Sequence, residues 1–216
     1  LSSKTVQIGN ITWSYNEGGS RANPSILLIH GLAGNRDNWN RVAHYLTPYY
    51  HVIIPDLPTN GDTQVPENFD ISIPNVTEQL RQFVEKIDIE DRLNVAGHSL
   101  GGSIATVYAS QYPFDTQSLF LLNSAGIYKH ALTPYTQNPS SLKQLIVSKP
   151  GDFDGVMHQL MQNPPAMPFK LKQAQEKLLI SQVAKEIQSS LMQIEQVLDA
   201  FFRDASRRGD LTSLDT

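Results

Sequence analysis

A serine stands among closely spaced glycines in the stretch Gly97-His98-Ser99-Leu100-Gly101-Gly102. An apolar run at residues 93–96 comes directly before this stretch, and a helical pattern begins directly after the serine. Such a strand-to-helix turn lifts a hydroxyl off the sheet, and it needs glycines because side chains there would collide with the neighbouring strand and helix. The start of the helix also places its positive dipole end beneath the serine. We therefore predict that Ser99 is a nucleophile, in preference to an idle serine in a glycine-rich turn.

A second stretch with chemical potential, His30-Gly31-Leu32-Ala33-Gly34, follows the apolar run at residues 25–29. Acyl transfer to a serine needs donors aimed at the oxygen that becomes negative, and backbone N–H groups suit this role because they are fixed in place. We expect the N–H of Leu100, directly after the nucleophile, and the N–H of Leu32 to form this oxyanion hole. We expect His30 to organise its loop rather than to act as the general base. The other supporting positions are Gly31, Gly97, His98 and Gly101.

Both loops require a sheet and helices to hold them. Residues 4–17 alternate in polarity around Gly9-Asn10, which predicts an antiparallel hairpin at a sheet edge. Four short apolar runs follow, at residues 26–29, 51–54, 93–96 and 119–122, and they are typical of parallel strands covered on both faces. Helical patterns fill the gaps at residues 38–48, 75–88 and 100–111. With right-handed crossovers, this order predicts a doubly wound α/β sheet that is mostly parallel.

The strand pattern stops after about Gly126. Residues 131–170 are rich in Pro, Asn, Gln and Ser, and an apolar stripe at helical spacing then runs from Ile180 to Phe201. We therefore divide the chain into a core at residues 1–127, a helical insertion at residues 128–213 and the start of a linker at residues 214–216. We expect the stripe to pack against the sheet domain rather than to contact a ligand.

At these motifs the chain resembles the α/β-hydrolase superfamily, and within it bacterial serine esterases and lipases that carry a helical cap. The resemblance rests on the loop at residues 30–34 with Trp39 after it, on the stretch at residues 56–63, and on the stretch around Ser99. It implies the α/β-hydrolase fold, a cap at residues 128–213, and ester hydrolysis through an acyl-enzyme on Ser99. The family box that begins at Asp56 usually reads Asp-x-x-Gly-x-Gly-x-Ser, whereas this chain has Thr59 and Thr63 in place of the first glycine and the serine.

A nucleophilic serine also needs a base and an acid that orients the base. In α/β-hydrolases the acid and the histidine follow the serine in the chain, after later strands. Only His130 and His158 follow Ser99, and both fall in the predicted cap, while Asn123 occupies the position after the run at residues 119–122. We therefore expect the acid and the histidine beyond residue 216, a core without its last strands, and an isolated chain that is inactive. The alternative is a short natural variant that recruits His130 or His158.

Composition limits the partners. The chain has 216 residues with 40% hydrophobic and 18% charged residues, which is typical of a globular domain. Seventeen basic against 21 acidic residues give a net charge of −4, which argues against nucleic acid. The absence of cysteine excludes a thiol nucleophile and a thiolate zinc site, and we predict no metal or cofactor. The expected partner is a small acyl ester or lipid, with contact between cap and lipid surface, and with a dimer or complementary chain at the open sheet edge as a further option.

Two other functions stay open. The missing acid and base suit a catalytically silent protein that binds a hydrophobic ligand or a partner chain, and other serine-dependent members of the superfamily include carbon–carbon bond hydrolases. The sequence shows no apolar run long enough for a membrane span and no signal peptide before Leu1. The bacterial cytoplasm, the periplasm and the exterior are all compatible with it, and we favour a location outside the cytoplasm.

Overall fold

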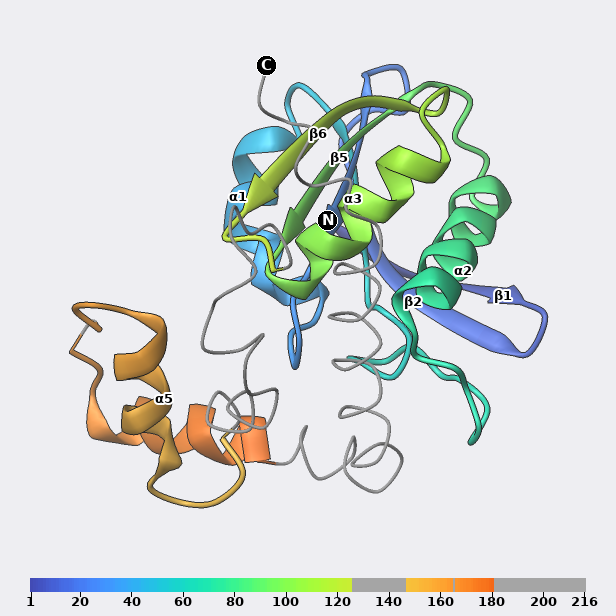
Figure 1. The fold of residues 1–216 in the computed structure, drawn as a ribbon. Helices are drawn as coiled ribbons and strands as arrows, with labels where there is room; N and C mark the ends of the chain where they lie inside the picture. The colour runs from blue at the N-terminus through green and yellow to red at the C-terminus, as the bar shows by residue number, and fades with distance from the viewer. Residues whose placement is uncertain (126–146, 165, 181–216) are drawn as a thin grey trace, which may run out of the picture. The chain divides into compact units, whose positions relative to one another are not determined.

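A six-stranded mixed sheet forms the centre of the first of two units into which the chain divides, Leu1–Ile127 and Tyr128–Thr216. The computed structural model describes residues 1–125, 147–164 and 166–180 (Figure 1). The elements of the first unit are β1 (Ser2–Ile8), β2 (Ile11–Gly18), β3 (Ser25–Ile29), the 3-10 helix η1 (Arg36–Trp39), α1 (Asn40–Leu46), β4 (His51–Pro55), α2 (Ile73–Lys86), β5 (Leu93–His98), α3 (Leu100–Gln111) and β6 (Thr116–Leu122).

The strand order is β1-β2-β4-β3-β5-β6. β1 and β2 form the hairpin, β2 pairs antiparallel with β4, and β4, β3, β5 and β6 run parallel. This confirms the predicted, mostly parallel sheet with an antiparallel hairpin at its edge. The helix predicted at residues 75–88 begins two residues earlier, at Ile73, because proline is tolerated in the first turn, where its missing N–H has no partner to lose.

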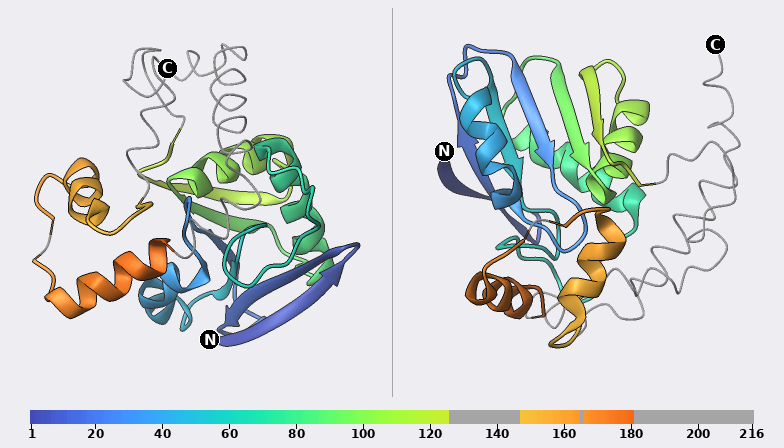
Figure 2. Two further views of the ribbon diagram at one scale, coloured as in Figure 1. Left: turned by 90° about the horizontal axis from the view of Figure 1, so that it is seen from below. Right: turned by 90° about the vertical axis from the view of Figure 1, so that its left-hand side faces the viewer.

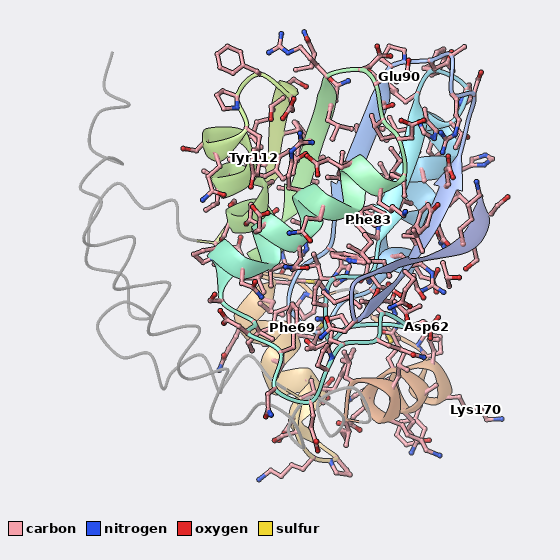
Figure 3. All side chains as sticks on the ribbon, turned by 90° about the vertical axis from the view of Figure 1, so that its right-hand side faces the viewer. Asp62, Phe69, Phe83, Glu90, Tyr112 and Lys170 are labelled. Carbon is pink, nitrogen blue, oxygen red and sulfur yellow. The ribbon has the colours of Figure 1, made fainter. Side chains whose placement is uncertain are left out.

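Helices cover both faces of the sheet (Figure 2). Successive residues of a strand point to opposite faces of the sheet, so each buried strand contributes side chains to two hydrophobic cores. The core on the α1 side contains Leu28, Trp39, Ala43, Val52, Ile54 and Ala96. On the other side Phe83 of α2 stacks on Trp13 of β2 with ring centroids 4.9 Å apart (Figure 3).

The last strand differs from the prediction. β3 and β4 are buried almost throughout, as the apolar runs predict, but on β6 Phe120 is 63% exposed and Leu119 is 38% exposed. The reason is its place at the edge, because among the described residues β6 pairs only with β5. Its apolar sequence therefore does not by itself indicate burial.

The second unit contributes the helix α5 (Asp152–Leu160) and a helical segment at residues 169–180. Its small core contains Val147, Phe153 and Val156. Glu176 accepts the N–H groups of Gly151 and Phe153 and so ties the helical segment to the start of α5. The predicted apolar stripe lies outside the described residues apart from Ile180. No helix in the described ranges combines the length and the apolar character that a membrane crossing requires.

The loop after β4 contains a threonine in a conformation that favours glycine. Thr59 has a φ of +72° and Gly61 has a φ of +54°. A β-branched residue in the left-handed region is strained, at a cost of roughly 1–2 kcal/mol. Thr59 occupies the position where the family box has its first glycine, so the chain keeps the glycine conformation without the glycine.

Thr59→Gly should therefore raise the free energy of unfolding, by about 0.5–1 kcal/mol after the greater flexibility of glycine in the unfolded chain is subtracted. Chemical denaturation measures this change. The matched control is Thr47→Gly, because Thr47 has an ordinary φ of −57° and its replacement should lower the stability. A loss of stability in Thr59→Gly comparable to that of the control would contradict the strain.

A buried ionic network joins the hairpin to the N-terminal ends of the parallel strands. Glu17 at the end of β2 accepts from Lys4 at 2.5 Å and pairs with Arg21 at 3.0 Å. Its Oε1 also lies 2.6 Å from Nε2 of His51, whose Nδ1 is 3.2 Å from Ser25 Oγ. Burial on its own raises the pKa of Glu17, but the hydrogen bonds from Lys4 and His51 and the positive charges of Arg21 and Lys4 outweigh it and hold the pKa at about 2.

The depressed pKa predicts a pH dependence. The stabilisation from ionised Glu17 is complete above its ordinary pKa of 4.5 and is lost as the pH falls toward 2. Glu17→Gln lacks this contribution, so the deficit of the variant in free energy of unfolding should narrow by about 3 kcal/mol between pH 7 and pH 2. Urea denaturation at a series of pH values measures it.

The exposed Glu67 supplies the control, since Glu67→Gln should differ from the wild type by an amount that changes less over the same range. A deficit of Glu17→Gln that stays constant down to pH 2 would show that the ion pairs contribute nothing to folding.

Candidate active site

The backbone at Ser99 adopts a strained conformation in a tight turn. Ser99 has φ 53° and ψ −120°, between the end of β5 and the first residue of α3. Its N–H donates to Leu122 O at 3.1 Å, and its carbonyl oxygen accepts from Gly102 at 2.9 Å and from Ala125 at 3.0 Å. Such a conformation costs of order 1–3 kcal/mol and persists because the surrounding hydrogen bonds fix it.

Glycines make this turn sterically feasible. A Cβ on Gly97 would lie 2.2 Å from the carbonyl oxygen of Gly101, and a Cβ on Gly101 would lie 2.3 Å from that of His30. A Cβ on Gly102 would lie 2.4 Å from Ser124 Oγ. The start of α3 therefore approaches β3 and β5 more closely than any other residue type would allow.

The loop after β3 lies beside the serine. A Cβ on Gly31 would be 3.0 Å from Ser99 Cβ and 3.2 Å from Nδ1 of His98, whose side chain is exposed at the same turn. Leu100 is the first residue of α3, so its N–H has no acceptor within the helix. In the described ranges no hydrogen bond uses the N–H of Leu32 or that of Leu100. Two backbone N–H groups, of Leu32 in the loop beside Ser99 and of Leu100 directly after it, thus have no described acceptor.

His30 is buried and uses both ring nitrogens on backbone groups. Its Nε2 accepts the N–H of Leu57 at 2.9 Å, so the ring proton is on Nδ1, which donates to Gly31 O at 2.8 Å. Burial lowers the pKa of His30, and the bond to Gly31 and the charge of Asp56 only partly oppose it. A neutral ring engaged at both nitrogens has none left for Ser99.

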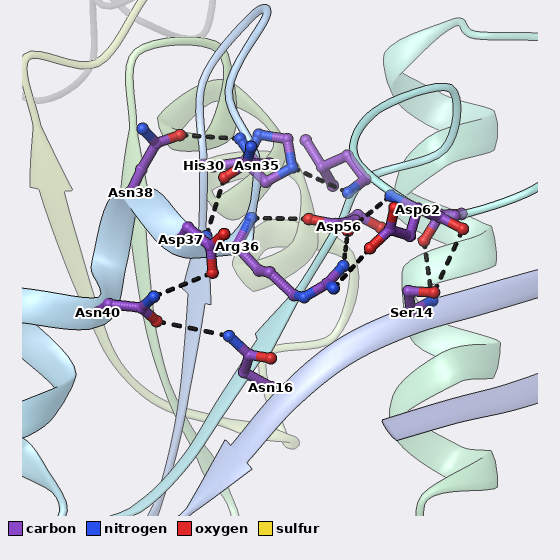
Figure 4. A network of polar contacts seen from close by, with 12 residues as sticks. Ser14, Asn16, His30, Asn35, Arg36, Asp37, Asn38, Asn40, Asp56 and Asp62 are labelled. Carbon is purple, nitrogen blue, oxygen red and sulfur yellow. Dashed lines mark hydrogen bonds and ion pairs between the residues drawn. The ribbon is translucent and has the colours of Figure 1, made fainter. Parts of the chain in front are cut away.

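A buried carboxylate lies behind the same loop (Figure 4). Asp56 is fully buried and accepts the backbone N–H of Arg36 at 2.7 Å, the guanidinium of Arg36 and the N–H of Asp62 at 2.8 Å. Asp62 is 72% exposed and also pairs with Arg36, at 2.6 Å. Gly61 is required here, because a Cβ would lie 2.1 Å from Asp56 Oδ2.

Sequence reasoning gave Asp56 no role beyond its place in a family motif and missed Arg36. One indication was available. Asp56 follows the apolar run at residues 51–54 and the loop with His30 follows the run at residues 25–29, and neighbouring parallel strands bring such loops to one edge of the sheet.

No described histidine of the first unit forms a hydrogen bond with Ser99, and the exposed ring of His98, the neighbouring residue, has no described hydrogen-bond partner. His44 lies on α1 and His51 at the opposite, N-terminal end of β4, while His158 lies on α5 in the second unit. His130 lies outside the described residues. No described ring nitrogen is hydrogen bonded to Ser99, and no three metal-ligating side chains of the described residues lie together.

All eight site residues predicted from the sequence belong to the turn around Ser99 or to the loop beside it: Ser99, Leu100, Leu32, His30, Gly31, Gly97, His98 and Gly101. Two segments that are about 70 residues apart in sequence thus form one site at the C-terminal ends of β3 and β5. Ligand sites of open α/β sheets lie at this end of the strands.

Comparison with known proteins agrees with this architecture. Residues 24–178 match the model of the alpha/beta hydrolase fold family. The chain is 34% identical over 168 residues to Lipase 1 of Psychrobacter immobilis, a match that covers 76% of this chain and 52% of that protein. The chain therefore spans about half the length of that curated relative.

Two solved structures are also similar to this chain in sequence and in fold. A crystal structure from Acinetobacter baumannii AYE, described as that of a candidate lipase, is 54% identical with a TM-score of 0.83, over 96% of this chain and 67% of that one. A membrane phospholipase A, described as a bacterial virulence factor, is 34% identical with a TM-score of 0.80, over 91% of this chain and 63% of that one. The match of the family model to most of the chain, together with this likeness, establishes that the chain belongs to the alpha/beta hydrolase fold family.

Proposed function

We propose that the protein is a serine carboxylic ester hydrolase that forms an acyl-enzyme on Ser99. The observation that carries this proposal is the strained turn, which holds Ser99 between β5 and α3 with Gly31 packed against its Cβ. Strain of this kind is kept where a side chain must be presented in one direction. The turn belongs to the C-terminal edge of the sheet, where a ligand can approach.

The chemistry has two balanced halves. A general base takes the Ser99 Oγ proton while Oγ bonds to the ester carbonyl carbon, and the carbonyl electron pair moves onto oxygen. The N–H groups of Leu32 and Leu100 stabilise this oxyanion, and each donor contributes about 3 kcal/mol in the transition state. Collapse of the intermediate expels the alcohol, which takes the proton from the base. Water then repeats the sequence on the acyl-enzyme and releases the carboxylic acid.

The base and its acid belong, in this proposal, to sequence outside the described residues. Support comes from the engagement of His30 with two backbone groups and from the position of His51 at the far end of β4. In the family the acid and the histidine follow the nucleophile in chain order. The isolated 216-residue chain should then show little turnover.

The proposed substrates are acyl esters of lipids. This rests on the names of the relatives, which include Lipase 1 of Psychrobacter immobilis and the membrane phospholipase A. The second unit would form the cap over the acyl chain, and its exposed apolar side chains, among them Met161 and Phe169, would suit contact with a lipid. The net charge of −4 fits a neutral lipid or ester better than nucleic acid.

Ser99→Ala tests the nucleophile. In the complete gene product a fluorophosphonate probe should label Ser99, and the variant should lose the label together with at least about 10⁴-fold of kcat on a p-nitrophenyl ester. Mass spectrometry of the labelled peptide and steady-state kinetics measure the two effects. Loss of Oγ removes the atom that carries the acyl group, so no partial activity should remain on the acyl-enzyme route.

Ser118→Ala is the matched control, because Ser118 is exposed on β6 and bonds only to Asn94 Oδ1 at 2.7 Å among the described residues. It should keep both the label and the turnover. A complete product that binds fatty acid, takes no label and hydrolyses no ester would instead favour the catalytically silent protein.

A further inference from the structure

Two consecutive residues after β4 hold the loop at residues 30–36 at both ends. At its start, the N–H of Leu57 donates to His30 Nε2 at 2.9 Å. At its end, Asp56 accepts both the backbone N–H of Arg36 at 2.7 Å and the Arg36 guanidinium (Figure 4). We call this arrangement of His30, Arg36, Asp56 and Leu57 the loop clamp.

Inside the clamp, one carbonyl group is fixed by two donors. Gly31 O accepts from Nδ1 of His30 at 2.8 Å and from the N–H of Gly34 at 3.1 Å. The peptide bond between Gly31 and Leu32 is planar and trans, like every other described peptide bond. The N–H of Leu32 therefore points away from Gly31 O in the same plane. Whatever orients the carbonyl of Gly31 also orients the N–H of Leu32.

We propose that His30 and Asp56 are positioning residues that aim the N–H of Leu32 at the oxyanion formed on Ser99. This inference rests on the proposed function, in which that N–H is one of the two oxyanion donors. Neither side chain touches the reacting atoms. His30 acts through the carbonyl of Gly31, and Asp56 acts by fixing Arg36 and, through the next residue, the anchor of His30.

The loop has features of a segment held against its own preference. Ala33 has a φ of +54°, which an unconstrained loop would avoid. Gly31 lies against Ser99 Cβ, so a shift of the loop alters the distance between donor and oxyanion directly. An oxyanion donor works because it is fixed before the reaction, and a misplacement of about 1 Å can cost about 10²-fold in rate.

Asp56 suits the role of a positioning residue because its carboxylate is fully buried. A fully buried carboxylate is stable only with several donors, and the two from Arg36 and the N–H of Asp62 supply them. The side chain of Asp62 is 72% exposed and contacts only the far nitrogen of the Arg36 guanidinium among the described residues. Among the described residues the Asp62 carboxylate contacts neither His30 nor Leu57 nor Asp56, so Asp62→Asn serves as a control.

Kinetics of the complete gene product test the proposal. His30→Leu and Asp56→Asn should each lower kcat by at least about 10-fold, with KM changed by less than about 3-fold. A trifluoromethyl ketone, which forms a tetrahedral oxyanion adduct with a serine, should lose affinity in the same proportion. His30→Gln should recover part of kcat, because its amide can accept from Leu57 and donate to Gly31 O. Asp62→Asn should stay within about 3-fold of the wild type.

Hydrogen exchange gives a readout that does not depend on activity. In folded His30→Leu and Asp56→Asn, the hydrogen-bonded amides of Gly34 and Arg36 should exchange at least about 10-fold faster than in the wild type, while Asp62→Asn should leave them protected. Circular dichroism identifies a variant that fails to fold. In that case kcat and amide exchange of His30→Gln are compared with those of the wild type instead.

Unchanged exchange of the Gly34 and Arg36 amides in the folded variants, or a rise in KM with kcat preserved, would overturn the clamp. The wild type could take no fluorophosphonate label while the two variants still exchange faster than it does. That result would overturn the proposed function and leave the hydrogen-bonded clamp standing.

Discussion

The close approach of α3 to the sheet is the constraint on which the site depends. Main-chain atoms of Gly97 and Gly101 meet where any Cβ would overlap a carbonyl oxygen, and this contact forces Ser99 into a left-handed backbone. It also brings the loop after β3 against the serine, because Gly101 packs on the carbonyl of His30. The proposed nucleophile and both proposed N–H donors are therefore placed by the backbone, which has fewer ways to move than a set of side-chain rotamers.

Polar groups gather at both ends of the parallel strands, with different physical consequences. At the N-terminal end Ser25, His51 and Glu17 form a hydrogen-bonded chain with the residue types of a catalytic triad. All three side chains are buried, and their polar groups bond to one another. At the C-terminal end Ser99 is only partly buried and its neighbours keep N–H groups free of described partners. Access and unused donors, rather than residue type, distinguish the candidate site.

The sequence predicted the features that depend on local pattern. The strands, α3 and the turn at Ser99 follow from apolar runs and glycine spacing within a few residues. The contact of Arg36 with Asp56 was not predictable in the same way, because it joins two loops 20 residues apart and depends on strand order. The left-handed φ of Thr59 was also hidden, since threonine normally avoids it. Phe120 shows the remaining difficulty, because an apolar edge strand and a buried strand have the same composition.

The distance between the two polar networks has a consequence for how substitutions combine. β4 separates His51 at one end from Asp56 just past the other, and five strand residues span about 17 Å. Effects on folding free energy at sites more than about 10 Å apart, with no shared partner, are usually additive. Changes around Glu17 can therefore adjust the stability of this unit independently of changes around Asp56, at the other end of the same short strand.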